Sequence, residues 1–283
     1  MTSKSAFKKE LEIIHSDLIK INDWMYENPE LAFEEFKTSE YLVNYLKNFS
    51  DSVIYPTRDL STAFEVTFGE EGPLVVLCVE YDALPEIGHA CGHNIIATAS
   101  IGAGIAIRNL VDDLGVRVKL LGTPAEEGGG GKIILLDNGA FEDAVCSMMI
   151  HPSSINVANP TFTTIQQYKV EFFGKDAHAA GSPDQGINAL DAQIQLFVNA
   201  STYRQQMTLT NRMHGVILDG GYKPNIIPSY TSSEWYLRSL NSEGLKKLEE
   251  DFLNFVNAAA ISTKCRSDVT VPDYQYAEIL NNK

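Results

Sequence analysis

The chain has 283 residues, of which 44% are hydrophobic and 21% charged, a balance typical of globular proteins and a length that allows two domains. Asp and Glu outnumber Lys and Arg by 37 to 22, and the net charge of −15 argues against nucleic-acid binding, which needs clustered basic residues. No apolar run approaches the ~20 residues needed to cross a bilayer, and the four scattered cysteines do not resemble a disulfide framework. We therefore expect a cytoplasmic protein that has neither a nucleic acid nor a membrane as partner.

The first part of the chain alternates between helical and extended patterns. Apolar residues recur at helical spacing over 5–28 and 34–49, with Pro29 between the two segments. The elements expected after them are short β runs at 52–56 and 62–68, strands at 73–80, 116–123 and 144–151, and helices at 94–113 and 132–141. Strands that alternate with helices predict β-α-β units, and therefore an α/β fold with a mostly parallel sheet covered by helices.

A different order of elements begins near residue 160. The pattern predicts, in turn, a strand at 161–174, a helix from about 185 to 206, strands at 214–219 and 226–239, a helix at 242–260 and a strand at 265–271. This β-α-β-β-α-β order is that of a ferredoxin-like domain. We therefore expect one domain over 1–160, a second over 161–272 and a short final segment over 273–283.

Three consecutive predicted strands end in potential metal ligands. The strand at 73–80 leads into EYDALPEIGHACGHN, the strand at 116–123 into TPAEEGGGG, and the strand at 144–151 into IHP. Because ligands of open α/β sheets bind beyond the carboxyl ends of the strands, these segments are expected to meet at one edge of the sheet. The side chains expected to converge there are Cys91, His93, Glu126, Glu127 and His151.

The residue types indicate which metal such a site would bind. A thiolate, imidazoles and a carboxylate together favour zinc or a neighbouring divalent transition metal over Mg²⁺ or Ca²⁺. Cys91 and His93 are two residues apart and cannot share a helix face, so we expect a turn at Gly92 that aims both inward. Of the adjacent glutamates, one is expected to bind the metal and the other to take a proton from a metal-activated water.

Each of these signals has an ordinary alternative when it is taken alone. A single cysteine is usually a small buried hydrophobe, and we assign that role to the other three, Cys78, Cys146 and Cys265. A pair of glutamates is more often a solvated surface feature. The GGGGK run resembles a phosphate loop, but Ile133 stands where Ser or Thr is required and two carboxylates would repel phosphate.

Five segments in order resemble the aminoacylase/carboxypeptidase-G family of metal-dependent amidohydrolases: DALPEIGHACGHN, TPAEEGGGGK, MMIHP, GKDAHAAGSPDQGINALDA and GGYKPNIIPSYTSSEWYLR. The resemblance covers essentially the whole chain. The most similar branch contains N-acyl-amino-acid hydrolases, aminobenzoyl-glutamate hydrolase and β-alanyl-lysine-type dipeptidases. The resemblance to this family implies a catalytic domain over 1–160, a lid domain over 161–272 that forms a homodimer, and a return to the catalytic domain from 273. Asn94 replaces an Asp common in the amino-acid-conjugate branch, which favours the dipeptidase and aminobenzoyl-glutamate side.

The resemblance also implies a role for individual residues. The implied metal ligands are Cys91, His93, Glu127 and His151. Glu126 is the implied general base, and Asp82 is implied to orient a metal ligand. His178 is implied to stabilise the oxyanion in the site of the partner subunit. Asn225 and Arg238 are implied to contact the carboxylate of the substrate. The cofactor is expected to be one or two divalent ions, with zinc favoured over Mn or Co.

The expected reaction is hydrolysis of an amide or peptide bond in a small N-acyl-amino acid or dipeptide-like substrate. The family supplies a last histidine ligand after the lid, whereas no histidine follows His214 here and the sequence stops at Lys283. The catalytic domain is therefore expected to be incomplete. This motivates an alternative hypothesis, an inactive truncated relative that dimerises or binds a ligand. A purely structural zinc site is disfavoured, because such sites are closed by four Cys or His ligands and have no spare glutamate such as Glu126.

Overall fold

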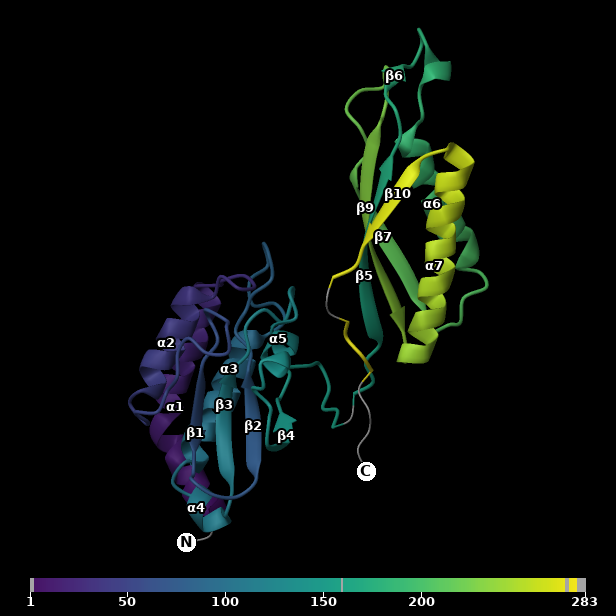
Figure 1. Ribbon diagram of the computed structural model, residues 1–283. Coiled ribbons are helices and arrows are strands. Elements are labelled where there is room, and N and C mark those ends of the chain that lie inside the picture. Colours follow the sequence, from purple (N-terminus) through teal and green to yellow (C-terminus); the bar gives the residue numbers. More distant parts are fainter. Residues whose placement is uncertain (1–2, 159, 273–274, 279–283) are drawn as a thin grey trace. The chain divides into compact units, whose positions relative to one another are not determined.

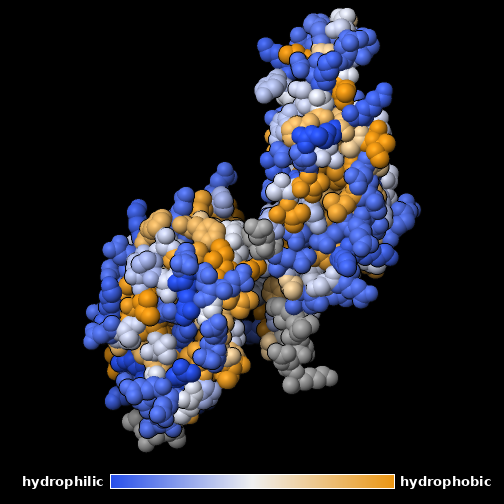
Figure 2. Space-filling model, in the orientation of Figure 1, coloured by the Kyte–Doolittle hydropathy of each residue, from blue (hydrophilic) through white to orange (hydrophobic). Residues whose placement is uncertain are grey.

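The computed structural model describes residues 3–158, 160–272 and 275–278. The chain divides into two compact units, Met1–Asn156 and Val157–Lys283, which we call the N-terminal and C-terminal units (Figure 1). Both combine helices with a β-sheet, so the predicted α/β fold class is confirmed. The visible surface of each unit mixes hydrophilic residues with smaller apolar areas (Figure 2).

The N-terminal unit is built around a mostly parallel sheet. Its elements are helices α1 (Ser3–Glu27), α2 (Phe36–Leu46), α3 (His93–Ile107), α4 (Val111–Leu114) and α5 (Gly131–Asp137), and strands β1 (Glu65–Phe68), β2 (Leu74–Val79), β3 (Arg117–Gly122) and β4 (Ala144–Met148). In the described part of the chain the strand order is β1-β3-β2-β4, with β2 parallel to both β3 and β4 and with β1 antiparallel to β3. The expected run at 52–56 is not a strand: Ile54 forms an isolated bridge to Glu65.

Helices cover both faces of this sheet. On one face, Ile21 of α1 and Ile101 of α3 are buried in one cluster with Leu120 of β3. On the other face, Leu135 of α5 packs in a second cluster that includes Val76 of β2. Burying each such side chain contributes roughly 1.5–3 kcal/mol to the free energy of unfolding. The burial of both faces explains why β2 reads as a continuous apolar run rather than an alternating one.

The C-terminal unit has the predicted ferredoxin-like order. Its elements are β5 (Thr164–Phe173), β6 (Ala177–His178), a 3-10 turn (Pro183–Gln185), α6 (Ala189–Tyr203), β7 (Arg212–Asp219), β8 (Ile226–Ile227), β9 (Tyr230–Ser239), α7 (Ser242–Thr263) and β10 (Arg266–Thr270). Among the described residues, β10, β5, β9 and β7 form an antiparallel sheet in that order, and β6 pairs with β8 in a separate ribbon.

The two helices of the C-terminal unit lie side by side on one face of its sheet (Figure 1). Trp235 and Leu237 of β9 are fully buried beneath them with Phe252 of α7. Asparagines begin both helices: the side chain of Asn188 accepts a hydrogen bond from the Leu190 amide, and that of Asn241 plays the same capping role for α7. The predicted final segment, 273–283, lies partly outside the described residues.

Candidate metal centre

The carboxyl ends of β2, β3 and β4 lie at one edge of the N-terminal sheet, as their parallel pairing requires. Val79 at the end of β2 is opposite Gly122 at the end of β3, and Leu77 is opposite Met148 at the end of β4. The segments that follow these three strands carry the predicted ligands. The expectation that the strand ends bring the ligands together is therefore met by the observed topology.

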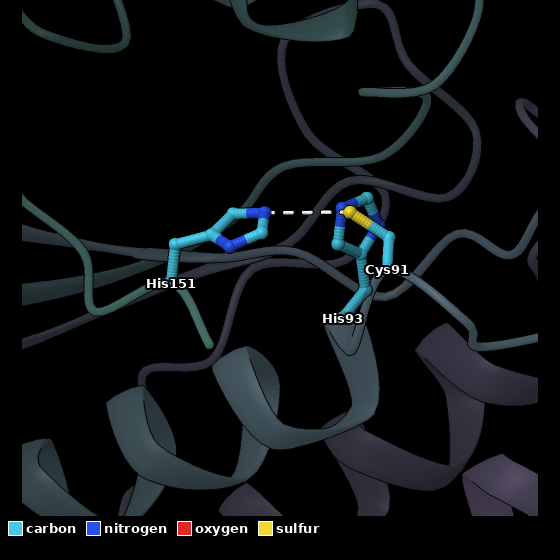
Figure 3. Close-up of side chains that lie close together, drawn as sticks. All are labelled: Cys91, His93 and His151. Atoms are coloured by element: carbon cyan, nitrogen blue, oxygen red, sulfur yellow. Dashed lines mark hydrogen bonds between the residues drawn. The ribbon is translucent and has the colours of Figure 1, made fainter. Parts of the chain in front are cut away.

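Cys91, His93 and His151 form one of two groups of potential metal ligands among the described residues (Figure 3). One donor atom from each lies within 4.8 Å of the others, and Cys91 Sγ is 3.3 Å from His151 Nε2. The turn between the first two ligands depends on Gly92, which has a φ of +90° and whose added Cβ would lie 2.7 Å from a side-chain atom of Pro152. Only glycine satisfies both constraints without strain, and this confirms the predicted turn.

The orientation of both imidazoles is set by hydrogen bonds at Nδ1. His93 Nδ1 lies 2.8 Å from the main-chain oxygen of Asp82 and 3.0 Å from its Oδ1, and His151 Nδ1 lies 2.7 Å from the Pro152 oxygen. Because these oxygens can only accept, each Nδ1 carries the proton and each Nε2 presents a lone pair in the neutral ring. This is the arrangement that metal-binding histidines adopt.

Carboxylates surround the inner nitrogen of His93. Its Nε2 lies 3.4 Å from Glu80 Oε2, 3.6 Å from Glu126 Oε2 and 3.8 Å from Glu127 Oε1. Nε2 is buried and forms no hydrogen bond with any described residue. Burial alone would lower the pKa of His93, but its hydrogen bond to Asp82 and the nearby carboxylates raise it to about 9. The position demands positive charge, from a proton or from a metal ion.

The loop that carries the glutamates is held against the rest of the site. The amide of Glu127 donates a hydrogen bond of 2.8 Å to Asp82 Oδ2, so one aspartate fixes both this loop and His93. An added Cβ on Gly131 would lie 1.9 Å from the Pro124 oxygen, so the loop can close in this way only with glycine there. Glu126 side-chain exposure is 37%, which leaves part of this carboxylate accessible to a small molecule.

The electrostatics of the site favour a divalent transition metal. Burial, and then Glu127, raise the pKa of the Cys91 thiol to about 12. Burial is also the largest cause of the raised pKa of Glu126, and Lys132 opposes it. A cation would offset this accumulation of negative charge, and the donor set of thiol, imidazole and carboxylate suits Zn²⁺, Mn²⁺ or Co²⁺. The residues present therefore fit such a metal.

A depression of about 430 Å³ lies beside these ligands in the N-terminal unit. Its lining includes Asn22, Tyr26, His89, Cys91 and Ser153. The size is suited to a small molecule rather than to a polymer.

The remaining predicted site residues lie in the C-terminal unit. His178, in β6, pairs with Ile226, and the neighbouring amide of Ala179 donates to the Asn225 oxygen, so the structure brings His178 and Asn225 together. Arg238 lies elsewhere, eight residues along β9 from Tyr230, a separation of roughly 26 Å at ~3.3 Å per residue. The roles predicted for these three residues stay predictions.

Two residues of the site were not expected from the sequence. Glu80 follows β2 directly, and its Oε2 is the carboxylate oxygen nearest to His93 Nε2. Lys132, in the first turn of α5, forms an ion pair with Oε1 of the same glutamate. The sequence feature that could have indicated Glu80 is its position at the end of a buried apolar strand, because a buried carboxylate is energetically unfavourable unless it is paired.

Comparison with known proteins identifies the family. Residues 163–264 match the model of a peptidase dimerisation domain. The chain is 39% identical to the Xaa-Arg dipeptidase of Mus musculus over 90% of this chain and 62% of that protein. It is 30% identical to the N-acetyl-L-cysteine deacetylase of Bacillus subtilis, over 90% of this chain and 67% of that protein. A solved dinuclear metal-binding peptidase of the M20 family from Bacillus subtilis superimposes with a TM-score of 0.69 at 19% identity, covering 96% of this chain and 77% of that one.

The chain therefore belongs to the M20 family of amidohydrolases and peptidases, the aminoacylase/carboxypeptidase-G type that the motifs predicted. It spans 60–64% of the length of the first three curated relatives that it matches. Among the described residues, no helix is long and apolar enough to cross a membrane.

Proposed function

We propose that the protein is a metal-dependent amidohydrolase that cleaves an amide or peptide bond in a small N-acyl-amino acid or dipeptide. The observation that carries this proposal is the position of His93: its buried Nε2 lies within 3.8 Å of three carboxylates, and the residue also clusters with Cys91 and His151. Cys91, His93, Glu127 and His151 would hold the metal, with zinc favoured over Mn or Co. The ligand chemistry supports this choice.

The two glutamates have different parts in this proposal. A divalent metal bound at the site would supply Lewis-acid activation of the attacking water and of the substrate carbonyl. Glu126 accepts a proton from that water and passes it to the leaving amine nitrogen. Burial is the main cause of the raised pKa of Glu126, and a raised pKa makes a carboxylate a stronger general base. Glu127 remains a ligand.

The C-terminal unit is proposed to form a homodimer. The match to a peptidase dimerisation domain supports this, as does an apolar depression lined by Ile194, Val198 and Ile217, all of them at least 44% exposed. His178 Nδ1 accepts hydrogen bonds from the amides of Ala180 and Gly181 at 3.2 and 3.0 Å, so the proton is on Nε2. That N–H is a suitable donor to the oxyanion formed in the site of the partner subunit.

The substrate is proposed to be a dipeptide, with Asn225 and Arg238 contacting its carboxylate. A related protein at 39% identity is an Xaa-Arg dipeptidase, so dipeptides that end in arginine are the first to test. The negative charge of the chain, −15, favours such a basic side chain over an acidic one. We place the protein in the cytoplasm, where a reducing environment would keep Cys91 and the other cysteines as the free thiols observed.

The test is a pair of substitutions with a matched control. Glu126→Gln should keep its metal and lose turnover by about 10²–10⁴-fold, because the base is lost and the ligands are kept. Glu127→Gln should lose metal as well, and the exposed control Glu71→Gln should change neither. Elemental analysis and hydrolysis of Xaa-Arg dipeptides, acyl-amino acids and aminobenzoyl-glutamate provide the measurements. Equal metal loss in the first two variants would show that the roles are wrong.

A further inference from the structure

We propose that Glu80 is a further ligand of the metal at His93, using Oε2, while Lys132 holds its Oε1. This inference rests on the metal site of the proposed function and adds to it a second carboxylate, one that directly follows β2. It would place ligands just after β2, at the start of α3 and in the loop after β3 around one ion.

The geometry of Glu80 and His93 is the first argument. Both side chains are 1% exposed, and Glu80 Oε2 lies 3.4 Å from His93 Nε2. Neither atom forms a hydrogen bond with any residue that the structure describes, so their contact lacks the alignment of an N–H···O bond. Buried polar atoms almost always have partners. Two such atoms side by side, each without one, indicate a shared third partner.

The separation of the two atoms fits a metal ion as that partner. Zinc binds nitrogen and carboxylate oxygen at about 2.0–2.2 Å in tetrahedral geometry, which puts two ligand atoms roughly 3.3–3.5 Å apart. The distance between Nε2 and Oε2 falls in this range. His93 already belongs to the two groups of potential ligands in the described residues, Cys91–His93–His151 and His93–Glu126–Glu127. Glu80 is closer to it than either of the later glutamates.

Lys132 explains how the buried carboxylate is held ready. A lone charge at this depth would be strongly unfavourable, and the ammonium of Lys132, itself 30% exposed, pairs with Oε1. This pair orients the carboxylate from the side of α5 and leaves Oε2 directed at His93. The ion pair with Lys132 accounts for Oε1, whereas the position of Oε2 beside His93 Nε2 requires a second positive charge, either a proton on His93 or a metal ion, and the experiment below distinguishes the two.

The experiment compares Glu80→Gln with Lys132→Met and with the exposed control Glu71→Gln in the full chain, using Zn²⁺ and Co²⁺ alone as probes. Calorimetric titration gives the Zn²⁺ affinity, and the visible absorption of bound Co²⁺ reports the ligand set. Glu80→Gln should weaken Zn²⁺ binding at least about 10-fold and change the Co²⁺ spectrum. Lys132→Met should keep the wild-type spectrum, because the ligands remain.

Thermal unfolding with and without Zn²⁺ separates a ligand role from a structural one. If Glu80 is a ligand, Glu80→Gln keeps the melting temperature of the metal-free protein within a few degrees and reduces the increase that Zn²⁺ produces. The opposite result would be that Glu80→Gln and Lys132→Met lower the melting temperature of the metal-free protein equally. If both also keep the wild-type increase in melting temperature with Zn²⁺ and the wild-type Co²⁺ spectrum, the inference is overturned. No binding of metal by the wild-type chain would overturn the proposed function, and this inference with it.

Discussion

Asp82 holds His93 in one orientation through two contacts: the ring Nδ1 donates to both the main-chain oxygen and Oδ1 of the aspartate. The other carboxylate oxygen of Asp82 accepts the amide proton of Glu127. Burial alone would raise the pKa of Asp82, but the hydrogen bonds from His93 and Glu127 outweigh it and hold the pKa below its ordinary value. One ionised carboxylate thus orients a histidine and a loop that come from different strand ends.

We therefore expect Asp82→Ala to weaken Zn²⁺ binding by about 10–100-fold although Asp82 is not itself a ligand. Asp82→Asn should have a smaller effect, since its amide oxygen can still accept from His93. Calorimetric titration of the two variants measures the difference. Wild-type affinity in the alanine variant would show that the ligands hold their positions without this aspartate.

A second prediction concerns the trans role of His178. If its Nε2–H stabilises the oxyanion in the site of the partner subunit, His178→Ala should lower turnover by about 10²–10³-fold. Mixing His178→Ala subunits with Glu126→Gln subunits should restore activity, because one of the two sites in each heterodimer then has every group it needs. Differently tagged subunits allow the heterodimer to be purified and assayed. A verified heterodimer without activity would place His178 in the site of its own subunit.

Metal affinity should rise with pH. In the metal-free protein the pKa of His93 is raised to about 9 and that of Cys91 to about 12. At pH 7, His93 is therefore an imidazolium and Cys91 a neutral thiol. Metal binding must displace these protons, which makes binding weaker as pH falls. Between pH 6 and 8 we expect the Zn²⁺ affinity to increase about 10-fold per pH unit for each proton displaced. Titrations in buffers with different ionisation enthalpies count the protons, and a pH-independent affinity would contradict the prediction.

The buried pair of Glu65 and Lys119 should make the N-terminal unit sensitive to acid. Lys119 Nζ lies 3.3 Å from Glu65 Oε2, and both side chains are at most 10% exposed. Burial alone would raise the pKa of Glu65, but Lys119, Thr57 and Arg58 outweigh it, and the pKa lies below its ordinary value of 4.5. The stabilisation is therefore present above about pH 4.5 and is lost as pH falls through the lower, folded-state value.

At pH 7, Lys119→Met should reduce the free energy of unfolding by on the order of 3 kcal/mol, because it leaves Glu65 buried without its main partner. The double variant with Glu65→Gln should recover most of that loss, and the exposed control Lys8→Met should be neutral. Urea unfolding at pH 7 and below pH 4 provides the values. A loss that the double variant does not recover would mean that the charge pair is not its cause.

Much of the metal centre could be predicted from the local sequence. The alternation of strands and helices predicted parallel β2, β3 and β4, and parallel strands must place their carboxyl ends, and so the segments with Cys91 and His151, at one edge. Gly92 was readable too, since two ligands separated by one residue require a turn. These inferences succeed because backbone periodicity and glycine preference act over a few neighbouring residues.

Other features were decided only by the tertiary structure. Glu80 and Lys132 are far apart in the sequence and meet because the end of β2 and the first turn of α5 pack together. Asn225 and Arg238 are near in the sequence and yet separate, because β9 is an extended strand that carries Arg238 away from the β6–β8 ribbon. Whether two polar atoms meet depends on how whole elements pack, and the burial that makes such meetings strong or costly is a property of the folded chain, which local pattern does not contain.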